Sequence, residues 1–132
     1  MIIMVIVISL VSFSNIYAGS IKEEYELQER CKKGAAEFVQ GKEYKDLIRT
    51  GDAYYTNHYN RKLNKCFVVI YSTNVIGQNY IDLWDINEHK RCGHFVSSLV
   101  DPLNAAADCT VLGNPCKSKS EWDSLVKPYV EE

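Results

Sequence analysis

The sequence has no excess of basic residues. It contains 15 Lys and Arg against 17 Asp and Glu, a formal net charge of −2. Nucleic acids and anionic membrane surfaces select a basic excess or stripe, so neither is an expected partner. The chain also lacks a glycine-rich phosphate loop, a G-x-S-x-G nucleophile elbow, a paired-carboxylate motif, internal repeats and low-complexity segments. No motif therefore demands an enzyme, and none predicts a cofactor.

Basic residues are also missing ahead of the N-terminal apolar run MIIMVIVISLVSF. A short apolar core that ends in a small residue, here Ala18, is typical of a secretory signal peptide. The missing basic residue, and Ile16 where a small residue is usual, depart from that pattern. The alternative is an uncleaved anchor, but the run is short for a membrane span of about 20 apolar residues. We expect cleavage after Ala18 and a protein that is exported, periplasmic or secreted, without stable membrane insertion afterwards.

Residues 19–132 are long enough for a single domain with a modest core. Residues 21–40 are predicted to form a helix, because four apolar side chains recur there at steps of four, four and three. These are Leu27, Cys31, Ala35 and Phe38. Lys42 to Gly51 has the composition of a mixed connector with a turn near Gly51.

The remaining chain is dominated by strand patterns. Predicted strands cover residues 53–58, 65–73, 80–86 and 91–98, with a short edge strand near 109–112. Residues 65–73 are apolar at both parities, which favours a central strand. A capping box at residues 120–123 predicts a final helix from Glu121 to about Tyr129. The fold class is α+β: an N-terminal helix packed on a four- to five-stranded antiparallel sheet, with a short C-terminal helix.

Five cysteines follow the leader: Cys31, Cys66, Cys92, Cys109 and Cys116. In an exported domain they are expected to form disulfides, and an odd number leaves one thiol. Cys31 on the buried helix stripe can reach Cys66 if the helix packs on that face of the central strand. Cys109 and Cys116 bracket a turn-forming VLGNP, which leaves Cys92 as the free thiol, able to link two chains. Other pairings remain open.

One face of the sheet is left for other contacts if the helix covers the opposite face. We expect that face to carry large side chains from three strands: Phe67, Val69, Tyr71, Tyr80, Trp84, Ile86 and Phe95. An exposed apolar face usually marks a partner surface, whereas the connectors and the C-terminal helix could instead cover it as a second core layer. Both alternatives remain open.

The tyrosine- and asparagine-rich stretch at residues 54–64 is the leading interaction candidate, since Tyr and Asn supply adaptable hydrogen bonds. With two aromatic residues from the sheet, the predicted binding set is Tyr55, Asn57, His58, Tyr59, Asn60, Tyr71 and Trp84. His58 could act as a general base, but a turn-fixing role is favoured because no carboxylate or nucleophile is close in sequence.

The segment DLWDINEHKRCGH offers several metal-ligating side chains. Asp82 and Asp85 are predicted on opposite faces, so only Cys92 and His94 would share one, which is too few for a zinc site. We therefore predict no metal site. A Cys92–His58 or Cys92–His94 catalytic pair is disfavoured, because a catalytic thiol in an oxidising compartment is prone to oxidation.

Three segments, NHYNRKLNKCFVVI, LWDINEHKRCG and CTVLGNPC followed by EWDSLVKPY, resemble a group of small exported bacterial proteins of uncharacterised function. The resemblance covers most of the chain after the leader. It implies paired cysteines at Cys31 and Cys66 and at Cys109 and Cys116. The position of Cys92 is commonly aromatic in that group, so the sequence departs there. The resemblance implies export and disulfides but no activity.

Three functions are consistent with these patterns. The first is a non-catalytic binding module for an unknown protein, peptide or envelope component. The second is an inhibitor-like protein against a hydrolase, presenting the disulfide-held loop 109–116. The third, less favoured, is a hydrolytic enzyme that uses His58 with a distant carboxylate. A binding module predicts an exposed aromatic patch, an inhibitor a protruding rigid loop, and an enzyme His58 in a closed cleft beside an acid.

Overall fold

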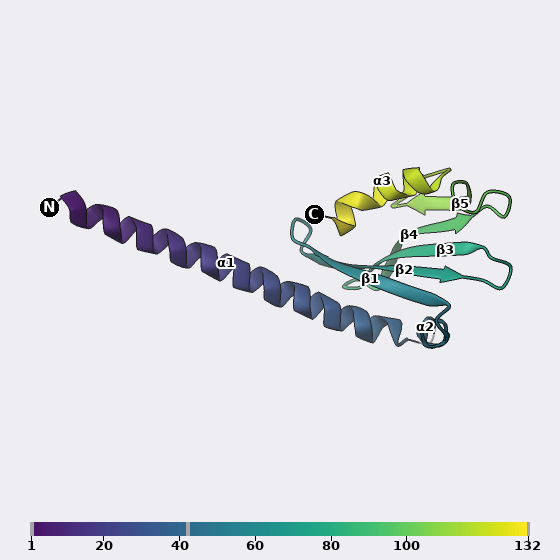
Figure 1. Ribbon diagram of the computed structural model, residues 1–132, viewed down its shortest axis with the longest axis horizontal. Helices are drawn as coiled ribbons and strands as arrows, with labels where there is room; N and C mark the ends of the chain where they lie inside the picture. The colour runs from purple at the N-terminus through teal and green to yellow at the C-terminus, as the bar shows by residue number, and fades with distance from the viewer. Residues whose placement is uncertain (1, 42, 132) are drawn as a thin grey trace.

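An antiparallel sheet with helices on both faces forms the body of the molecule (Figure 1). The computed structural model describes residues 2–41 and 43–131, and it describes side chains from Ser20 onward. The sheet is a simple meander, since its strands follow the order β1 to β6 both in sequence and in space. The elements are α1 (Ile2–Val39), α2 (Lys45–Thr50), β1 (Ala53–Asn60), β2 (Lys65–Thr73), β3 (Asn79–Asp85), β4 (Lys90–Ser97), β5 (Ala106–Val111), β6 (Asn114–Pro115) and α3 (Lys119–Val130). The α+β class is therefore confirmed.

Strand β2 has the bounds and the two apolar faces that its sequence predicts. Val68 and Ile70 face α1, whereas Phe67 and Val69 face α3. The sheet thus separates two cores. The α1-side core contains Ala35, Val39, Tyr44, Val68 and Ile70. The α3-side core contains Phe67, Val69, Ile81, Leu83, Phe95, Cys109, Val111, Cys116, Trp122 and Val126.

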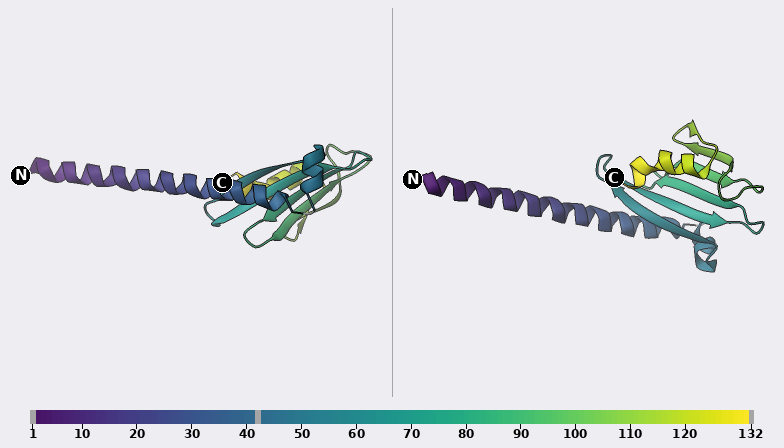
Figure 2. Two further views of the ribbon diagram at one scale, coloured as in Figure 1. Left: turned by 90° about the horizontal axis from the view of Figure 1, so that it is seen from below. Right: turned by 45° about the horizontal axis from the view of Figure 1, so that its top comes forward.

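Helix α1 meets the sheet through its C-terminal part and extends well beyond it at the other end (Figures 1 and 2). Of the predicted stripe, Cys31 and Ala35 are buried, whereas Leu27 and Phe38 are half-buried. Val39 rather than Phe38 continues the four-residue repeat as the next buried residue. The helix ends at Val39, and the N–H of Gly41 closes the last turn on the carbonyl of Phe38. The predicted cleavage after Ala18 involves side chains outside the described residues and stays a prediction. In the described part of the chain, no helix is long and apolar enough to span a membrane.

Both expected disulfides form. Cys31 on α1 is bonded to Cys66 on β2, and Cys109 on β5 to Cys116 just after β6. The first bridge joins the helix to the sheet across 35 residues of sequence, and the second closes a short hairpin of separation 7. Within the described residues Cys92 is the free cysteine.

The prediction of which β3 side chains face away from α1 is wrong by one residue. Ile81 and Leu83 pair with Tyr71 and Val69 and share their α3-side core. Trp84 and Ile86 instead pack on the α1-side core, and Tyr80 shares their parity. Because β3 is apolar at both parities, its sequence alternation does not decide which set faces which layer.

Helix α3 covers the face that the sequence left open. Trp122 and Val126 are buried against it, so this part of the face is a second core layer rather than a free surface. The helix begins earlier than expected, at Lys119, because Ser118 rather than Ser120 is the N-cap. The hydroxyl of Ser118 accepts a bond from the N–H of Glu121, and the Glu121 carboxylate accepts one from the N–H of Lys117.

Three smaller differences concern the connections and strand number. The 42–51 connector contains the short helix α2, whose Ile48 packs on the α1-side core with Tyr44. The sheet has six strands rather than four or five, the sixth being the two-residue β6. In β4, Cys92 is an extra residue in a bulge, because Leu83 pairs with Gly93 and Trp84 with Arg91.

Candidate functional site

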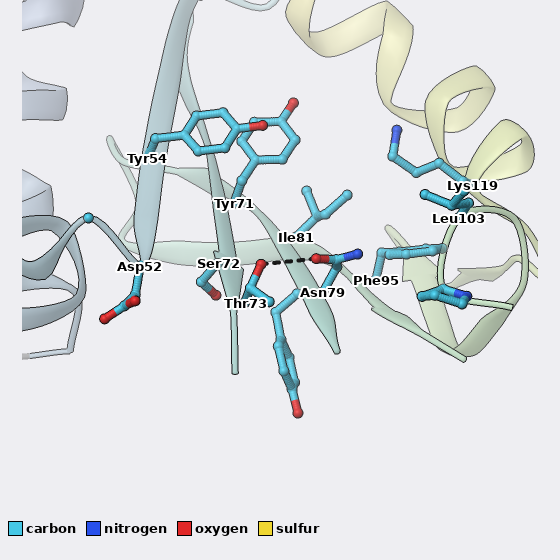
Figure 3. Close-up of a pocket in the computed structure, with 13 residues that line it drawn as sticks. Asp52, Tyr54, Tyr71, Ser72, Thr73, Asn79, Ile81, Phe95, Leu103 and Lys119 are labelled. Atoms are coloured by element: carbon cyan, nitrogen blue, oxygen red, sulfur yellow. Dashed lines mark hydrogen bonds between the residues drawn. The ribbon is translucent and has the colours of Figure 1, made fainter. Parts of the chain in front are cut away.

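A hollow of about 470 Å³ opens on the α3 side of the sheet, where β1 begins and β2 ends (Figure 3). Its lining comes from the first three strands, β4, the 98–105 connection and the start of α3. Ile81 and Phe95 provide an apolar floor that is continuous with the α3-side core. This size lies within the range of sites that hold small ligands or single side chains of a partner.

Two tyrosines form one wall of the hollow. The rings of Tyr54 and Tyr71 are stacked with their centroids 4.6 Å apart and an interplanar angle of 9°. Tyr54 is 63% exposed, whereas Tyr71 is half-buried against the α3-side core. Burial, and then the neighbouring Tyr54, raise the pKa of Tyr71 above its usual value. The Tyr71 phenol is therefore neutral at physiological pH, and the pair presents a flat aromatic surface with polar edges.

The opposite wall comes from the connection between β4 and β5. Leu103 is 77% exposed and lines the hollow together with Pro102. This connection is held in place by backbone hydrogen bonds. The N–H of Ala105 donates to the carbonyl of Asp101, and the N–H of Lys119 donates to the carbonyl of Asn104. The apolar wall is thus fixed to the start of α3.

Charged and polar groups surround the apolar centre. Asp52 and Lys119 line opposite sides of the hollow (Figure 3). Between them the hydroxyl of Thr73 donates to Asn79 Oδ1 at 2.9 Å. An apolar floor with a few polar groups at the rim suits binding and orientation of a largely apolar group.

The structure divides the seven predicted binding residues between the two faces of the sheet. Tyr55, Asn57, Tyr59 and Trp84 lie on the α1 side, whereas His58, Asn60 and Tyr71 lie on the α3 side. They do not form one surface. Of the seven, only Tyr71 lines the hollow of about 470 Å³ beside the tyrosine pair, which we call the aromatic hollow.

Several of these residues have structural contacts. Asn60 is fully buried, donates to the carbonyl of Pro128 at 2.8 Å and accepts from the N–H of Leu63 at 3.0 Å. It therefore closes the β1–β2 turn and holds it against α3. The Tyr59 hydroxyl donates to Asn64 at 2.6 Å across the same turn.

Trp84 belongs to a polar network beneath α1. Its Nε1 donates to the Tyr44 hydroxyl at 3.0 Å, and Tyr44 donates to Asp82 at 3.2 Å. Burial, followed by the charge of Asp82, raises the pKa of Tyr44. Asp82 also pairs with Arg91 at 3.4 Å. The indole N–H of Trp84 is thus hydrogen-bonded to another side chain inside the fold.

His58 lines a smaller hollow of about 230 Å³ between β1 and α3. Asp123 on α3 and Glu131 just after it line the same hollow, so two acidic residues far from His58 in sequence come near it. The rest of the lining includes the apolar core residues Phe67 and Trp122. The enzyme hypothesis requires an acidic residue near His58, and these two residues are its candidates.

The bulge in β4 separates Cys92 from His94. Cys92 packs beside the α3-side core, whereas His94 is opposite Asp82 and pairs with Asp108 at 2.8 Å. The expectation that Cys92 and His94 share a face is therefore wrong. Burial is the main cause that raises the pKa of the Cys92 thiol, whose Sγ contacts the Lys90 carbonyl. A thiol that keeps its proton is a poor nucleophile.

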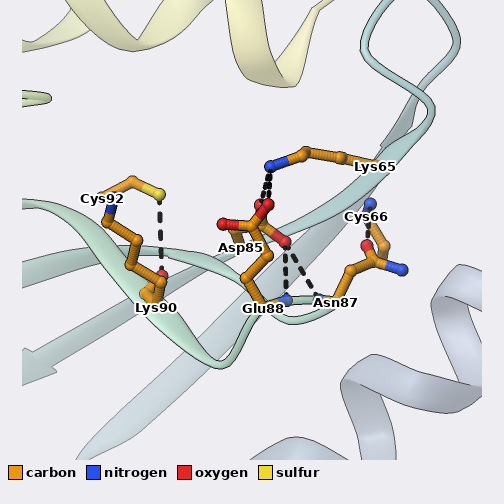
Figure 4. A network of polar contacts seen from close by, with 7 residues as sticks. All are labelled: Lys65, Cys66, Asp85, Asn87, Glu88, Lys90 and Cys92. Atoms are coloured by element: carbon orange, nitrogen blue, oxygen red, sulfur yellow. Dashed lines mark hydrogen bonds and ion pairs between the residues drawn. The ribbon is translucent and has the colours of Figure 1, made fainter.

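A compact ionic cluster lies beside Cys92 (Figure 4). Lys65 Nζ is 2.6 Å from Asp85 and 2.5 Å from Glu88. Asp85 is 2% exposed and also accepts bonds from the N–H groups of Asn87 and Glu88. These contacts fix the β3–β4 turn. Among the residues that the structure describes, no group of three or more His, Cys, Asp or Glu side chains is placed to hold a metal ion.

The loop 109–116 is a tight hairpin. Leu112 and Gly113 form its turn with φ angles of 48° and 83°, and the Leu112 N–H donates to the carbonyl of Cys92 at 2.7 Å. The Leu112 side chain remains exposed. The disulfide and the bond to β4 make the turn rigid, but two residues give it little reach beyond the sheet.

Comparison with known proteins finds no family model, no curated protein and no solved structure that matches this chain. Functional argument therefore depends on the site itself.

Sequence analysis did not identify most of the aromatic hollow. Asp52 and Leu103 come from connections and Lys119 from the start of α3, and the sequence does not encode their relative positions locally. One available indication was the apolar segment SLVDPL at 98–103, where Leu99, Val100 and Leu103 are exposed. Apolar side chains in a connection rather than a strand can indicate a contact surface.

Proposed function

We propose that the protein acts outside the cytoplasm as a non-catalytic binding module. Its two disulfides indicate an oxidising environment, where such bonds form and persist. The signal-peptide pattern that ends at Ala18 supports export through the secretory route. The resemblance to small exported bacterial proteins agrees with this location.

The contact site in this proposal is the aromatic hollow between Tyr54 and Leu103. The observation on which it depends is the stacked tyrosine pair, exposed at one ring, beside an apolar floor of Ile81 and Phe95. Stacked aromatic rings bind flat apolar groups well and lose little conformational entropy. The expected ligand is an aromatic or flat apolar group of a protein, a peptide or an envelope component.

Ligand-observed NMR with a library of small aromatic and aliphatic fragments tests this site. Aromatic fragments should bind the wild-type chain, and Tyr54→Ala should abolish their binding because it removes the exposed ring. Val75→Ala is a suitable control, since Val75 is fully exposed in the β2–β3 turn and does not line the hollow. Equal fragment binding by Tyr54→Ala and wild type would place the contact elsewhere.

Export is tested separately by fractionation and N-terminal sequencing of the chain expressed with its own leader. The proposal expects the protein outside the cytoplasm with Gly19 as its first residue. Recovery of the full-length chain in the cytoplasm, with its cysteines reduced, would contradict the proposed location without bearing on the fragment assay.

The hydrolase-inhibitor alternative has one supporting observation, the exposed Leu112 on a turn made rigid by the Cys109–Cys116 bridge. An inhibitor would lower the activity of at least one hydrolase in a panel, and Leu112→Lys would remove that effect. Inhibition that persists in Leu112→Lys would exclude this hairpin as the inhibitory element.

A further inference from the structure

The outer edge of β1 has backbone groups that point away from the sheet. The N–H of Tyr59 donates to Gln28 Oε1 at 3.0 Å, which shows that this N–H faces outward rather than toward β2. Backbone direction alternates along a strand, so the N–H groups of Tyr55 and Asn57 face the same way. The structure records no partner for these two N–H groups among the described residues. This leaves part of the edge open for hydrogen bonding.

This edge lacks the features that usually prevent strands from pairing with other chains. Strand β1 reads AYYTNHYN, with no charged residue and no proline, and it pairs with β2 through eight consecutive residues without a bulge. Soluble proteins commonly protect edges with charge, proline, bulges or short strands. The opposite edge of this sheet has such protection, because β6 is two residues long and contains Pro115. An unprotected β1 points to a strand that covers it.

A second unfilled surface lies beside the same edge. Ile21 and Tyr25, one turn apart on α1, are 55% and 66% exposed. They line a hollow of about 490 Å³ together with Tyr59 and Arg61 at the end of β1. The helix therefore presents apolar side chains next to the open strand edge.

We propose that β1 pairs with β1 of a second copy of this chain, antiparallel about a two-fold axis near Tyr55. This register uses the open residues 53–57 and keeps the bond between Gln28 and Tyr59. It places Tyr54 of one copy opposite Thr56 of the other and joins the two sheets into one. In this register Asp52 of each copy falls opposite His58 of the other. Arg61 lies three residues beyond His58 and pairs with Glu24 of its own α1.

A second copy explains both surfaces, whereas an isolated extended peptide would explain only the strand edge. The two-fold axis stands perpendicular to the joined sheet, so both copies carry α1 on the same face. Each α1 then lies over the junction, where Ile21 and Tyr25 can pack against the other copy. Hydrogen bonds would come from the strands and apolar burial from the helices.

Sedimentation velocity over a range of concentrations tests the pairing, with Cys92→Ser as the reference so that no dimer can be linked through that thiol. The reference should dimerise reversibly. Asn57→Pro removes an outward N–H at an edge position where proline is tolerated, and Tyr25→Glu places a charge at the helix contact. Each should weaken dimerisation by about tenfold or more. Val75→Glu, in the exposed β2–β3 turn, should leave it unchanged.

Tyr25→Glu alters an exposed helix residue, so it tests the pairing even if Asn57→Pro does not fold. A reference protein that remains monomeric at all concentrations would overturn the proposal, as would dimers that persist unchanged in Tyr25→Glu. A dimer seen in wild type but lost in Cys92→Ser would show a thiol-linked pair instead. None of these variants replaces a residue that lines the aromatic hollow. Because the pairing places Tyr54 at the junction, fragment binding is measured on the monomeric Tyr25→Glu variant, so that failure of the dimer and failure of the fragment site are distinguished.

Discussion

The two disulfides should differ in their contribution to stability, and the difference follows from the length of chain that each one closes. The Cys31–Cys66 bridge has a sequence separation of 35 and the Cys109–Cys116 bridge a separation of 7. In the loop-entropy description, a bridge destabilises the unfolded state by an amount that grows with the logarithm of loop length. This gives about 3.8 kcal/mol for the first bridge and about 2.5 kcal/mol for the second.

The perturbation is removal of each bridge by paired alanine substitutions, Cys31→Ala with Cys66→Ala and Cys109→Ala with Cys116→Ala. Cys92→Ser should be present in every variant to prevent disulfide exchange. All four bridged cysteines are buried to a similar extent, so the loss of packing largely cancels in the comparison. The expected difference between the two variants is then about 1.3 kcal/mol.

Urea unfolding at 25 °C, followed by circular dichroism, measures the free energy of unfolding of both variants. The slope with urea should be compared as well, because it reports changes in the compactness of the unfolded chain. The reasoning would be refuted if the Cys109–Cys116 variant lost as much stability as the Cys31–Cys66 variant at equal slopes. In that case local strain or packing, rather than loop closure, would dominate.

Three further predictions concern single side chains. Gly93→Ala should lower the free energy of unfolding by about 1–3 kcal/mol, because a Cβ there would lie 3.0 Å from the backbone oxygen of Thr110 and 3.2 Å from the Trp122 ring. An unchanged melting temperature would show that Thr110 and Trp122 move aside. Asp85→Asn should cost about 1–3 kcal/mol in urea unfolding, since this buried carboxylate accepts bonds from Lys65 and two backbone N–H groups; wild-type stability would contradict that role. Burial raises the pKa of Tyr44 in the folded chain, so above about pH 10 the unfolded state loses the proton first and stability should fall as pH rises. Tyr44→Phe should reduce that fall in a series of urea midpoints from pH 8 to about 11, and an identical pH profile would exclude Tyr44 as its source.

Sequence information was sufficient where both local pattern and tertiary environment require the same structure. Strand β2 alternates between two apolar sets because it is buried on both faces, and its bounds were predicted correctly. The helix positions Cys31 and Ala35 and the turn at Asn60–Asn64 have similarly direct sequence patterns. These elements then made the Cys31–Cys66 pairing geometrically reasonable.

The errors arise where a pattern allows two solutions that only packing decides. Strand β3 has Ile81 and Leu83 at one parity and Trp84 at the other, and the core beneath α3 has room for the first set. Ser118 and Ser120 can both start a helix, but only Ser118 has a Glu three residues later, which closes the capping box. The bulge at Cys92 has one local sequence marker, the adjacent Gly93, because an isolated glycine in a strand often accompanies a bulge. Without the bulge, Cys92 and His94 would share a face.

The candidate site was harder to predict than the fold for a related reason. Tyr54 and Tyr71 are separated by a complete hairpin, and their stacking depends on the register of β1 against β2. Leu103 and Lys119 reach the hollow only because the connection after β4 is tied to the start of α3. A surface assembled from six segments has no continuous motif.

The bridge between Cys31 and Cys66 also determines how the protein responds to mechanical force. When the chain is pulled by its N-terminus and C-terminus, tension leaves α1 at Cys31 and enters β2 directly through the covalent bond. The residues between the two cysteines, which include α2 and all of β1, are bypassed and cannot be stretched. A pulled molecule therefore keeps its first hairpin turn and the edge strand inside a closed covalent ring, while the rest of β2 and the elements from β3 to α3 bear the load.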